Sequence, residues 1–266
     1  MALERREGRV TMHSTRRDGI RKLLKGIESG DPESVVVVNE ARYVQHNPMT
    51  REGSEGLAEL FKRLSQTSPR VVVHRIFEDG DYVFGHVEYD FADIVAGFEV
   101  FRFEDGFAVE HWDNLQHLND EPNPSGHTML DGSTEITDLD RTEANRSLVR
   151  SFADEVLVDR SLDRLEHYVS TDVIEHDPGR SDGLAALRSA LSEVTSTGEP
   201  TIGYRRVHRV LAEGNFVLCA AEGTVGGTHS ALYDLVRLAD GQIVEHWDSF
   251  EAIPPRSEWN NDNGKF

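Results

Sequence analysis

The sequence contains two closely similar stretches, "FEVFRFEDGFAVEHWD" at 98–113 and "YDLVRLADGQIVEHWD" at 233–248. In each one, apolar and polar residues alternate on both sides of an Asp-Gly pair, which is typical of a β-hairpin. The closing five residues, Val-Glu-His-Trp-Asp, are identical in the two stretches. The sequence therefore predicts the same hairpin twice, each copy ending in a strand that carries a histidine and a carboxylate.

Two further blocks repeat in the same order upstream of these hairpins. The block "YVQHNPMTREGSEGLAELFKRL" (43–64) aligns with "VIEHDPGRSDGLAALRSAL" (173–191), and "VVVHRIFEDGDYVFGHVE" (71–88) aligns with "RRVHRVLAEGNFVLCAAE" (205–222). Because three blocks keep their order, we interpret the chain as a tandem duplication. The repeats are separated by a segment rich in Pro, Gly, Ser, Asp and Asn, which is typical of a linker.

The expected organisation has five parts. They are an N-terminal extension (1–13), a first domain (14–118, called repeat 1), a linker (119–140), a second domain (141–254, called repeat 2) and a C-terminal tail (255–266).

Within each repeat, helical patterns come first and strand patterns come last. Apolar residues at helical spacing predict a first helix over 14–30 and over 141–158. A short second helix is expected from Pro32 and from Ser161, and a third over 54–66 and 183–194. Alternating apolar runs then predict four strands, which are 70–78, 81–91, 95–103 and 107–116 in repeat 1. Helices that precede an antiparallel meander make an α+β domain.

The composition and net charge argue against some classes of function. The 266 residues carry a net charge of −20, which argues against nucleic-acid binding because that function needs a basic surface. No apolar run is long enough for a membrane helix, and the start of the chain does not look like a signal peptide, so a soluble, cytoplasmic protein is expected. Only four residues are lysines, which fits either a salt-rich cytoplasm or a high-GC genome.

The register of the last hairpin decides which side chains share a face. A three-residue turn at 105–107, with Gly106 at positive φ, would place Arg102 opposite Glu110. The equivalent turn in repeat 2 would place Arg237 opposite Glu245, whereas a two-residue turn would separate both pairs. Since opposite charges across a strand pair are favourable, we expect the first register.

This register predicts two chemically different faces. One face carries Arg102, Glu110 and Trp112. The other face sets the carboxylate of Glu99 against that of Asp113, beside His111, and in repeat 2 it sets Asp234 against Asp248, beside His246. Two carboxylates that face each other on a partly apolar surface should raise the pKa of one of them, which suits proton transfer.

The "HNP" before a helix and the closing hairpin resemble the SnoaL-like family of the nuclear transport factor 2-like superfamily. The resemblance covers most of both repeats. It implies two tandem cone-shaped domains, each with three N-terminal helices wrapped by a curved antiparallel sheet around a ligand pocket. The family commonly dimerises, so an internal pseudo-dimer of the two repeats and a further homo-oligomer are also implied.

The resemblance also implies a function. It suggests a cofactor-independent acid–base enzyme of the cyclase, isomerase or dehydratase type that acts on a small hydrophobic carbonyl compound. In the family's cyclases an aspartate on the last strand transfers the proton, and it matches Asp113 and Asp248 here. The opposing carboxylate or the adjacent histidine would stabilise the enolate oxygen. The alternative is a non-catalytic module of the same fold that binds a small molecule or another protein.

Other candidates have both a structural and a functional interpretation. His46 and His176 precede Asn-Pro and Asp-Pro, so each could cap the following helix or act as a base at the pocket mouth. The remaining candidates for ligand contact are His74, His208, Phe101, Trp112 and Trp247, and the two tryptophans suit packing at least as well.

Metal and nucleophile chemistry have weaker support. His46, His74, His111 and Asp113 include the ligand types of a two-His, one-carboxylate site, but the short spacings of a metal motif are missing, so no metal is expected. The single cysteine, Cys219, lies in an apolar run and is interpreted as a packing residue. The sequence has no glycine-rich phosphate loop and no G-x-S-x-G motif, so we expect no cofactor.

Overall fold

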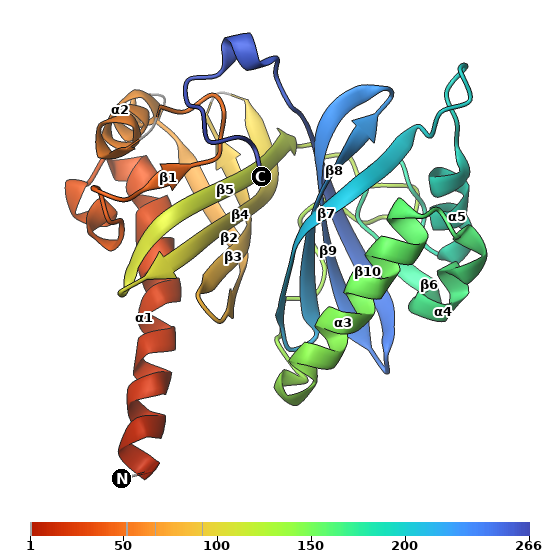
Figure 1. Cartoon of the computed structure of the whole chain (residues 1–266), viewed down its shortest axis with the longest axis horizontal. Helices are drawn as coiled ribbons and strands as arrows, with labels where there is room; N and C mark the ends of the chain where they lie inside the picture. Colours follow the sequence, from red (N-terminus) through yellow and green to blue (C-terminus); the bar gives the residue numbers. More distant parts are fainter. Residues whose placement is uncertain (1, 52, 67, 92) are drawn as a thin grey trace. The chain divides into compact units, whose positions relative to one another are not determined.

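The computed structural model describes residues 2–51, 53–66, 68–91 and 93–266 and divides the chain into two compact units (Figure 1). Unit 1 comprises Met1–Asp113 together with Pro254–Phe266, and unit 2 comprises Asn114–Ile253. The unit boundaries therefore differ from the repeat boundaries. The segment expected as a linker belongs to unit 2, and the tail that follows repeat 2 belongs to unit 1.

Unit 1 has helical segments first and a sheet last, as the sequence predicts. Its helical elements are α1 (Ala2–Ser29), the 3₁₀ helix η1 (Pro32–Val37) and α2 (Gly53–Ser65), and the tail adds η5 (Arg256–Glu258). Its strands are β1 (Val44–Gln45), β2 (Arg70–Asp79), β3 (Tyr82–Asp90), β4 (Ile94–Glu104) and β5 (Phe107–His117). The sheet order is β1-β5-β4-β3-β2, and the short β1 pairs parallel to β5.

Unit 2 repeats this plan. Its helical elements are η2 (Leu139–Arg141), α3 (Thr142–Phe152), the π-helix η3 (Ala153–Val158), η4 (Leu162–Arg164), α4 (Leu165–Tyr168) and α5 (Leu184–Ser192). Its strands are β6 (Val169–Glu175), β7 (Ile202–Glu213), β8 (Phe216–Val225), β9 (Thr228–Ala239) and β10 (Gln242–Ala252). The order β6-β10-β9-β8-β7 matches that of unit 1 strand for strand. The α+β class predicted for both repeats is confirmed.

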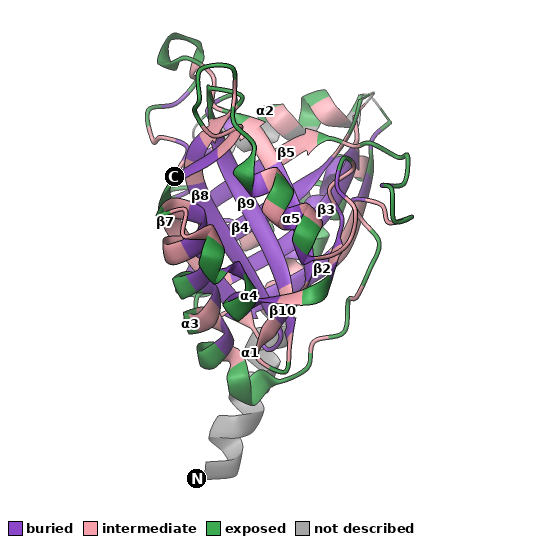
Figure 2. Cartoon of the chain, turned by 90° about the vertical axis from the view of Figure 1, so that its right-hand side faces the viewer, coloured by how far each residue is buried: buried purple, intermediate pink, exposed green. Residues whose placement is uncertain are grey.

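The core of each unit lies between the helices and one face of the sheet, where Figure 2 shows the strands as mostly buried. In α1, the predicted apolar stripe of Ile20, Leu23, Leu24 and Ile27 is buried. In unit 2, the helices α3, α4 and α5 lie on one face of the sheet (Figure 1) and contribute Val149, Leu165 and Leu187 to the core. Cys219 is buried in the same core, and burial raises the pKa of its thiol well above 9.0.

The last hairpin of repeat 2 has the predicted register, but its turn is shorter than predicted. Gln242 pairs with Ala239, so the turn consists of Asp240 and Gly241, with φ of 50° and 78°, and has two residues where three were expected. The pairing then shifts at a β-bulge between Ile243 and Glu245, which brings Glu245 opposite Arg237. The bulge restores the salt pair that a two-residue turn alone would separate. Asp105 and Gly106 also have positive φ, at 53° and 87°, so repeat 1 uses the same turn.

The segment that follows each repeat binds in the unit of the other repeat. Residues 260–265 of the tail lie in unit 1, where Asn263 Nδ2 donates to the backbone oxygen of Gln45 at 3.0 Å. In unit 2, Asn123 Nδ2 of the expected linker donates to the backbone oxygen of Glu175 at 2.7 Å. Gln45 and Glu175 occupy equivalent strand positions, each aligned with the histidine of the last strand. The two units are thus completed in the same way, each by a segment from outside its own repeat.

Among the described residues, no helix is long and apolar enough to cross a membrane.

Candidate active site

The two faces predicted for the last hairpin are present in unit 2. Asp248 lies directly opposite Asp234, and His246 lies opposite Val236, whereas Glu245 pairs with Arg237 on the alternate positions. In unit 1 the side-chain contacts agree with the same arrangement. Arg102 Nε donates to Glu110 Oε2 at 2.6 Å, and His111 Nε2 contacts Glu99 Oε2.

His246 lies between two carboxylates on the inner face of unit 2. Its Nδ1 is 3.0 Å from Glu175 Oε2 and its Nε2 is 3.0 Å from Asp234 Oδ1. Because carboxylates only accept hydrogen bonds, both ring nitrogens act as donors and the ring is an imidazolium. Burial opposes this charge, but Glu175 and Asp234 outweigh it and raise the pKa of His246 well above 6.5.

Asp248 lies beside a buried arginine. Arg180 Nη2 donates to Asp248 Oδ2 at 3.2 Å, and Arg180 Nη1 donates to Glu175 Oε2 at 2.7 Å. Burial raises the pKa of Asp248 to about 6, and Asp177 and Asp234 add to this shift while Arg180 and His246 oppose it. The prediction that one of two opposed carboxyls has a raised pKa is therefore met in repeat 2, although burial contributes more than the opposing acid.

Asp234 is held by two donors. Its Oδ1 accepts from Tyr204 OH at 2.8 Å as well as from His246. Its Oδ2, Glu175 Oε1 and Arg180 Nε are buried and make no hydrogen bond with the described residues. Buried polar atoms without partners are uncommon in folded proteins, so this cluster has the capacity to bind a polar group.

These groups line a cavity inside unit 2. Its polar lining consists of Arg180, Tyr204, Asp234, His246 and Asp248, and its apolar lining consists of Phe152, Leu157, Val169, Leu187, Leu191, Ile202, Val236, Ile243 and Phe250. The empty volume is about 390 Å³ including the open mouth, but the centre of a water molecule can reach only about 20 Å³ of it. The cavity combines apolar walls with a few convergent polar groups, as small-molecule sites commonly do, and it is narrow.

In unit 1 the equivalent histidine has one carboxylate partner and not two. His111 Nε2 contacts Glu99, while His111 Nδ1 is 2.8 Å from Gln45 Oε1, which also accepts from the backbone N–H of Asn47. Both ring nitrogens again face acceptors, so this ring is also an imidazolium. Burial opposes the charge, and Glu99 raises the pKa of His111. Tyr89 OH donates to Glu99 Oε1 at 2.7 Å, although Tyr89 lies on β3 and Tyr204 lies on β7.

Asp113 has a different cation from Asp248. Lys265 Nζ, from the tail, donates to Asp113 Oδ1 at 3.1 Å, and Asn47 Nδ2 donates to Asp113 Oδ2 at 2.7 Å. Burial alone would raise the pKa of Asp113, but Lys265, His111 and Asn47 outweigh it and lower this pKa below 3.8. Asp113 is therefore a carboxylate at neutral pH and a weaker base than Asp248.

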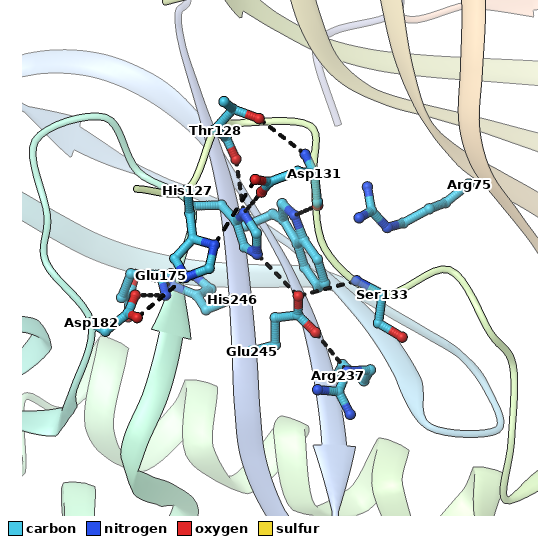
Figure 3. Close-up of polar contacts among 12 residues, drawn as sticks. Arg75, His127, Thr128, Asp131, Ser133, Glu175, Asp182, Arg237, Glu245 and His246 are labelled. Atoms are coloured by element: carbon cyan, nitrogen blue, oxygen red, sulfur yellow. Dashed lines mark hydrogen bonds and ion pairs between the residues drawn. The ribbon is translucent and has the colours of Figure 1, made fainter. Parts of the chain in front are cut away.

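A second arrangement, on the outer faces of the last strands, is repeated in both units. His46 stacks on Trp112 with ring centroids 4.7 Å apart, and His176 stacks on Trp247 at 4.5 Å. The Nε2 of each histidine contacts the glutamate of its strand, Glu110 at 2.9 Å or Glu245 at 3.1 Å. Figure 3 shows Glu245 between Ser133 and Arg237. These histidines and tryptophans lie on the face opposite Asp113 and Asp248.

The other predicted candidates lie apart from the inner cluster or beside it. His74 and His208 contact Glu88 and Glu222 at 3.0 and 3.1 Å. Phe101 stacks on His111 with centroids 4.5 Å apart. The structure does not bring together the metal set considered from the sequence, His46, His74, His111 and Asp113, because only the last two share a cluster.

Sequence reasoning missed seven members of the two clusters, which are Gln45, Asn47, Tyr89 and Lys265 in unit 1 and Glu175, Arg180 and Tyr204 in unit 2. A signal existed for Arg180, because it aligns with Thr50 and so places a charge where repeat 1 has none. Glu175 could have been found by alternation, since the residue before His176 must point to the opposite face of an extended segment. Lys265 has no local signal, because it lies 152 residues from Asp113 along the chain.

Comparison with known proteins identifies the family to which both repeats are similar. The profile of the SnoaL-like domain matches residues 20–111 and 149–246, once in each repeat. Among curated proteins, none matches the chain in sequence.

Solved structures of similar fold cover one repeat at a time. A candidate ketosteroid isomerase from Kribbella flavida is 23% identical over 43% of this chain and 84% of its own, with a TM-score of 0.37. An LEH-like epoxide hydrolase from M. tuberculosis is 19% identical over 42% of this chain and 85% of its own, with a TM-score of 0.34. An NTF-2-like protein of unknown function from Burkholderia xenovorans is 17% identical over 47% and 99%, with a TM-score of 0.38.

Proposed function

This chain belongs to the SnoaL-like family as a tandem pair of domains, and we propose that its second repeat is a cofactor-independent acid–base enzyme for a small, largely apolar carbonyl compound. The observation that carries the proposal is the cavity of unit 2, in which Asp248 and Arg180 meet among apolar walls. A carboxyl group with a pKa of about 6 accepts a proton near neutral pH more strongly than an ordinary aspartate does.

In this proposal Asp248 removes a proton from the carbon next to the substrate carbonyl. The developing oxyanion needs a hydrogen-bond donor, and Arg180 Nε has no partner among the described residues. His246 is a poorer donor for the substrate, because both of its nitrogens already face carboxylates. We therefore assign the oxyanion to Arg180, whereas the sequence pointed to the opposing carboxyl or the histidine. His246 then positions Asp234 and Glu175.

The same chemistry is less favourable in repeat 1. Asp113 has a lowered pKa, and its two oxygens are occupied by Lys265 and Asn47. Proton abstraction by Asp113 would first require the ammonium of Lys265 to move. We therefore propose that catalysis belongs to repeat 2 and that Asp113 stabilises unit 1.

Hydrogen–deuterium exchange tests this proposal without knowledge of the full reaction. The protein is incubated in D₂O with a panel of small alicyclic and aliphatic ketones, and loss of the α-proton signal is followed by NMR. We expect Asp248→Asn to slow exchange by about 10²- to 10⁴-fold, the usual contribution of a general base. Asp113→Asn is the matched control and should exchange at the wild-type rate within a few-fold. Equal losses in the two variants, or full activity in Asp248→Asn, would refute the assignment.

A non-catalytic binding module is the second candidate, and the narrow cavity and the Arg180–Asp248 ion pair favour it. In that case ketones that bind, as seen by shifts of the Trp or methyl NMR signals of unit 2, would show no α-exchange above buffer. A ketone that both binds and exchanges supports the enzyme, and one that binds without exchange supports the binding module.

A further inference from the structure

Two histidines and an aspartate gather on the outer face of unit 2, away from the cavity. His127 and Asp131 come from the segment that follows repeat 1, and His176 follows β6 (Figure 3 labels the first two). One ligand atom from each of the three lies within 4.8 Å of the other two. We propose that His127, Asp131 and His176 bind a divalent first-row transition-metal ion, with Zn²⁺ as the best match.

His176 is oriented as a metal-ligating histidine is. Its Nε2 is 3.1 Å from Glu245 Oε1, and its Nδ1 points to Asp131 Oδ1 at 2.8 Å and to the Thr128 carbonyl oxygen at 2.8 Å. Nδ1 faces two acceptors here, as it does when it carries a proton, so binding of a metal ion would release that proton, while the carboxylate on Nε2 keeps the proton of that nitrogen in place.

His127 shows the same orientation. Its Nε2 is 3.3 Å from Asp182 Oδ2, and its Nδ1 is 3.9 Å from Asp131 Oδ2. The two rings are 5.4 Å apart. Each histidine thus places Nε2 on its own carboxylate and Nδ1 toward a different oxygen of Asp131. Carboxylate–histidine–metal sites regularly combine these features.

The backbone around Asp131 is held in place. Trp247 Nε1 donates to the Asp131 carbonyl oxygen at 3.0 Å, and the Asp131 N–H donates to Thr128 Oγ1 at 3.2 Å. Gly132 has φ of 93°, and a Cβ there would lie 2.2 Å from Glu245 Oε1, so only glycine fits. The Asp131 side chain is 44% exposed, which leaves the site open to ions from solvent.

The donor set indicates the kind of ion. Two imidazole nitrogens and one carboxylate oxygen suit Zn²⁺ and related ions, and they do not suit Ca²⁺ or Mg²⁺, which prefer oxygen ligands throughout. Three protein ligands leave one position of a tetrahedron for water or for the Thr128 carbonyl oxygen. The buried trio Glu99, His111 and Asp113 is a weaker candidate, because Lys265 already places a cation on Asp113.

Repeat 1 offers a matched control. His46 has the same neighbours as His176, with Glu110 on Nε2, Trp112 against the ring and the Gly264 carbonyl oxygen at 2.9 Å from Nδ1. The segment 260–265 beside it contains no histidine that could match His127. His46 therefore reproduces the surroundings of His176 without the second imidazole.

The test is metal titration of the full chain after treatment with a chelator. Calorimetry with Zn²⁺ should give one site per chain with Kd below about 10 µM, and Co²⁺ should give the visible absorption of a tetrahedral site. His127→Ala, which changes a partly exposed side chain, should weaken Zn²⁺ binding by at least about tenfold, and Asp182→Asn by about tenfold or more. His46→Ala and His111→Gln should bind as the wild type does. The proposal is overturned if the wild type binds no Zn²⁺, if His127→Ala retains wild-type affinity, or if His111→Gln or His46→Ala abolishes binding.

Discussion

The two repeats place the same Val-Glu-His-Trp-Asp on the same strand but balance its buried carboxylate with different cations. In unit 1 the cation is Lys265, from the far end of the sequence, and the pKa of Asp113 is lowered. In unit 2 it is Arg180, four residues after His176, and the pKa of Asp248 is about 6. Arg180 is shared with Glu175, a carboxylate for which unit 1 has the neutral Gln45. The pKa of the aspartate that ends the duplicated pentapeptide therefore depends on residues outside the pentapeptide.

Removal of either cation should have the largest effect on the free energy of unfolding, and the effect should differ between the two units. Arg180→Ala leaves Asp248 and Glu175 buried without their shared donor, so the free energy of unfolding should fall by about 3–5 kcal/mol. Lys265→Ala leaves Asp113 with Asn47, and the cost should be smaller, about 1–3 kcal/mol. Urea denaturation measures both losses.

An exposed arginine provides the control for these two variants. Arg150→Ala removes an ion pair with Asp154 on the surface of α3 and should change stability by less than about 1 kcal/mol. A larger loss for Lys265→Ala than for Arg180→Ala would show that the shared arginine is not the more important cation.

The two aspartates should give opposite pH dependences of stability. The folded-state pKa of Asp248 lies above its usual value of 3.8, so the stability it contributes is present below about pH 4 and is lost as pH rises through about 6, on the order of 2–3 kcal/mol. The pKa of Asp113 is lowered, so its contribution is present above pH 3.8 and is lost as pH falls through its folded-state value.

Denaturation from pH 2 to pH 7 tests this difference. Subtracting the curve of Asp248→Asn from that of the wild type should give a contribution that declines between about pH 4 and pH 7. The same subtraction with Asp113→Asn should give a contribution that is nearly constant from pH 7 to about pH 4 and declines below pH 4. Two declines in the same direction would mean that the repeats do not differ in this respect.

The smallest difference concerns the outer salt pairs. Glu245 is 3% exposed and Glu110 is 20% exposed, although Arg237 and Arg102 each donate to them at 2.6 Å. Arg237→Ala should therefore reduce the free energy of unfolding by about 1–2 kcal/mol, and Arg102→Ala by less than about 1 kcal/mol. Equal losses by urea denaturation would show that burial of the glutamate does not distinguish the two pairs.

Much of the fold could be predicted because its signals are local. Alternation places Glu245 and His246 on opposite faces whatever the rest of the chain does. The length of the turn was harder to predict. A two-residue turn followed by a bulge gives the same pairing as a three-residue turn, and the alternation of apolar residues does not distinguish the two. The facing carboxylates were predicted and are present in repeat 2.

The two cations, Arg180 and Lys265, could not be predicted from the sequence for a different reason. Arg180 lies in a segment interpreted as the turn before a helix, and Lys265 is separated from Asp113 by the whole of repeat 2. No periodicity relates such distant positions. Lys265 is the largest of the contacts that lower the pKa of Asp113, whereas burial raises the pKa of Asp248 in spite of Arg180, so sequence reasoning found the acids and could not distinguish them.

The return of the tail to unit 1 also sets an order of events during protein synthesis. A ribosome makes Asp113 long before Lys265, and all of unit 2 is translated in between. Domains generally fold in the order in which they emerge, so the N-terminal domain would ordinarily be finished first. Here Asp113 lacks the ammonium group of Lys265 until the tail has been made, so the domain that begins first is completed last.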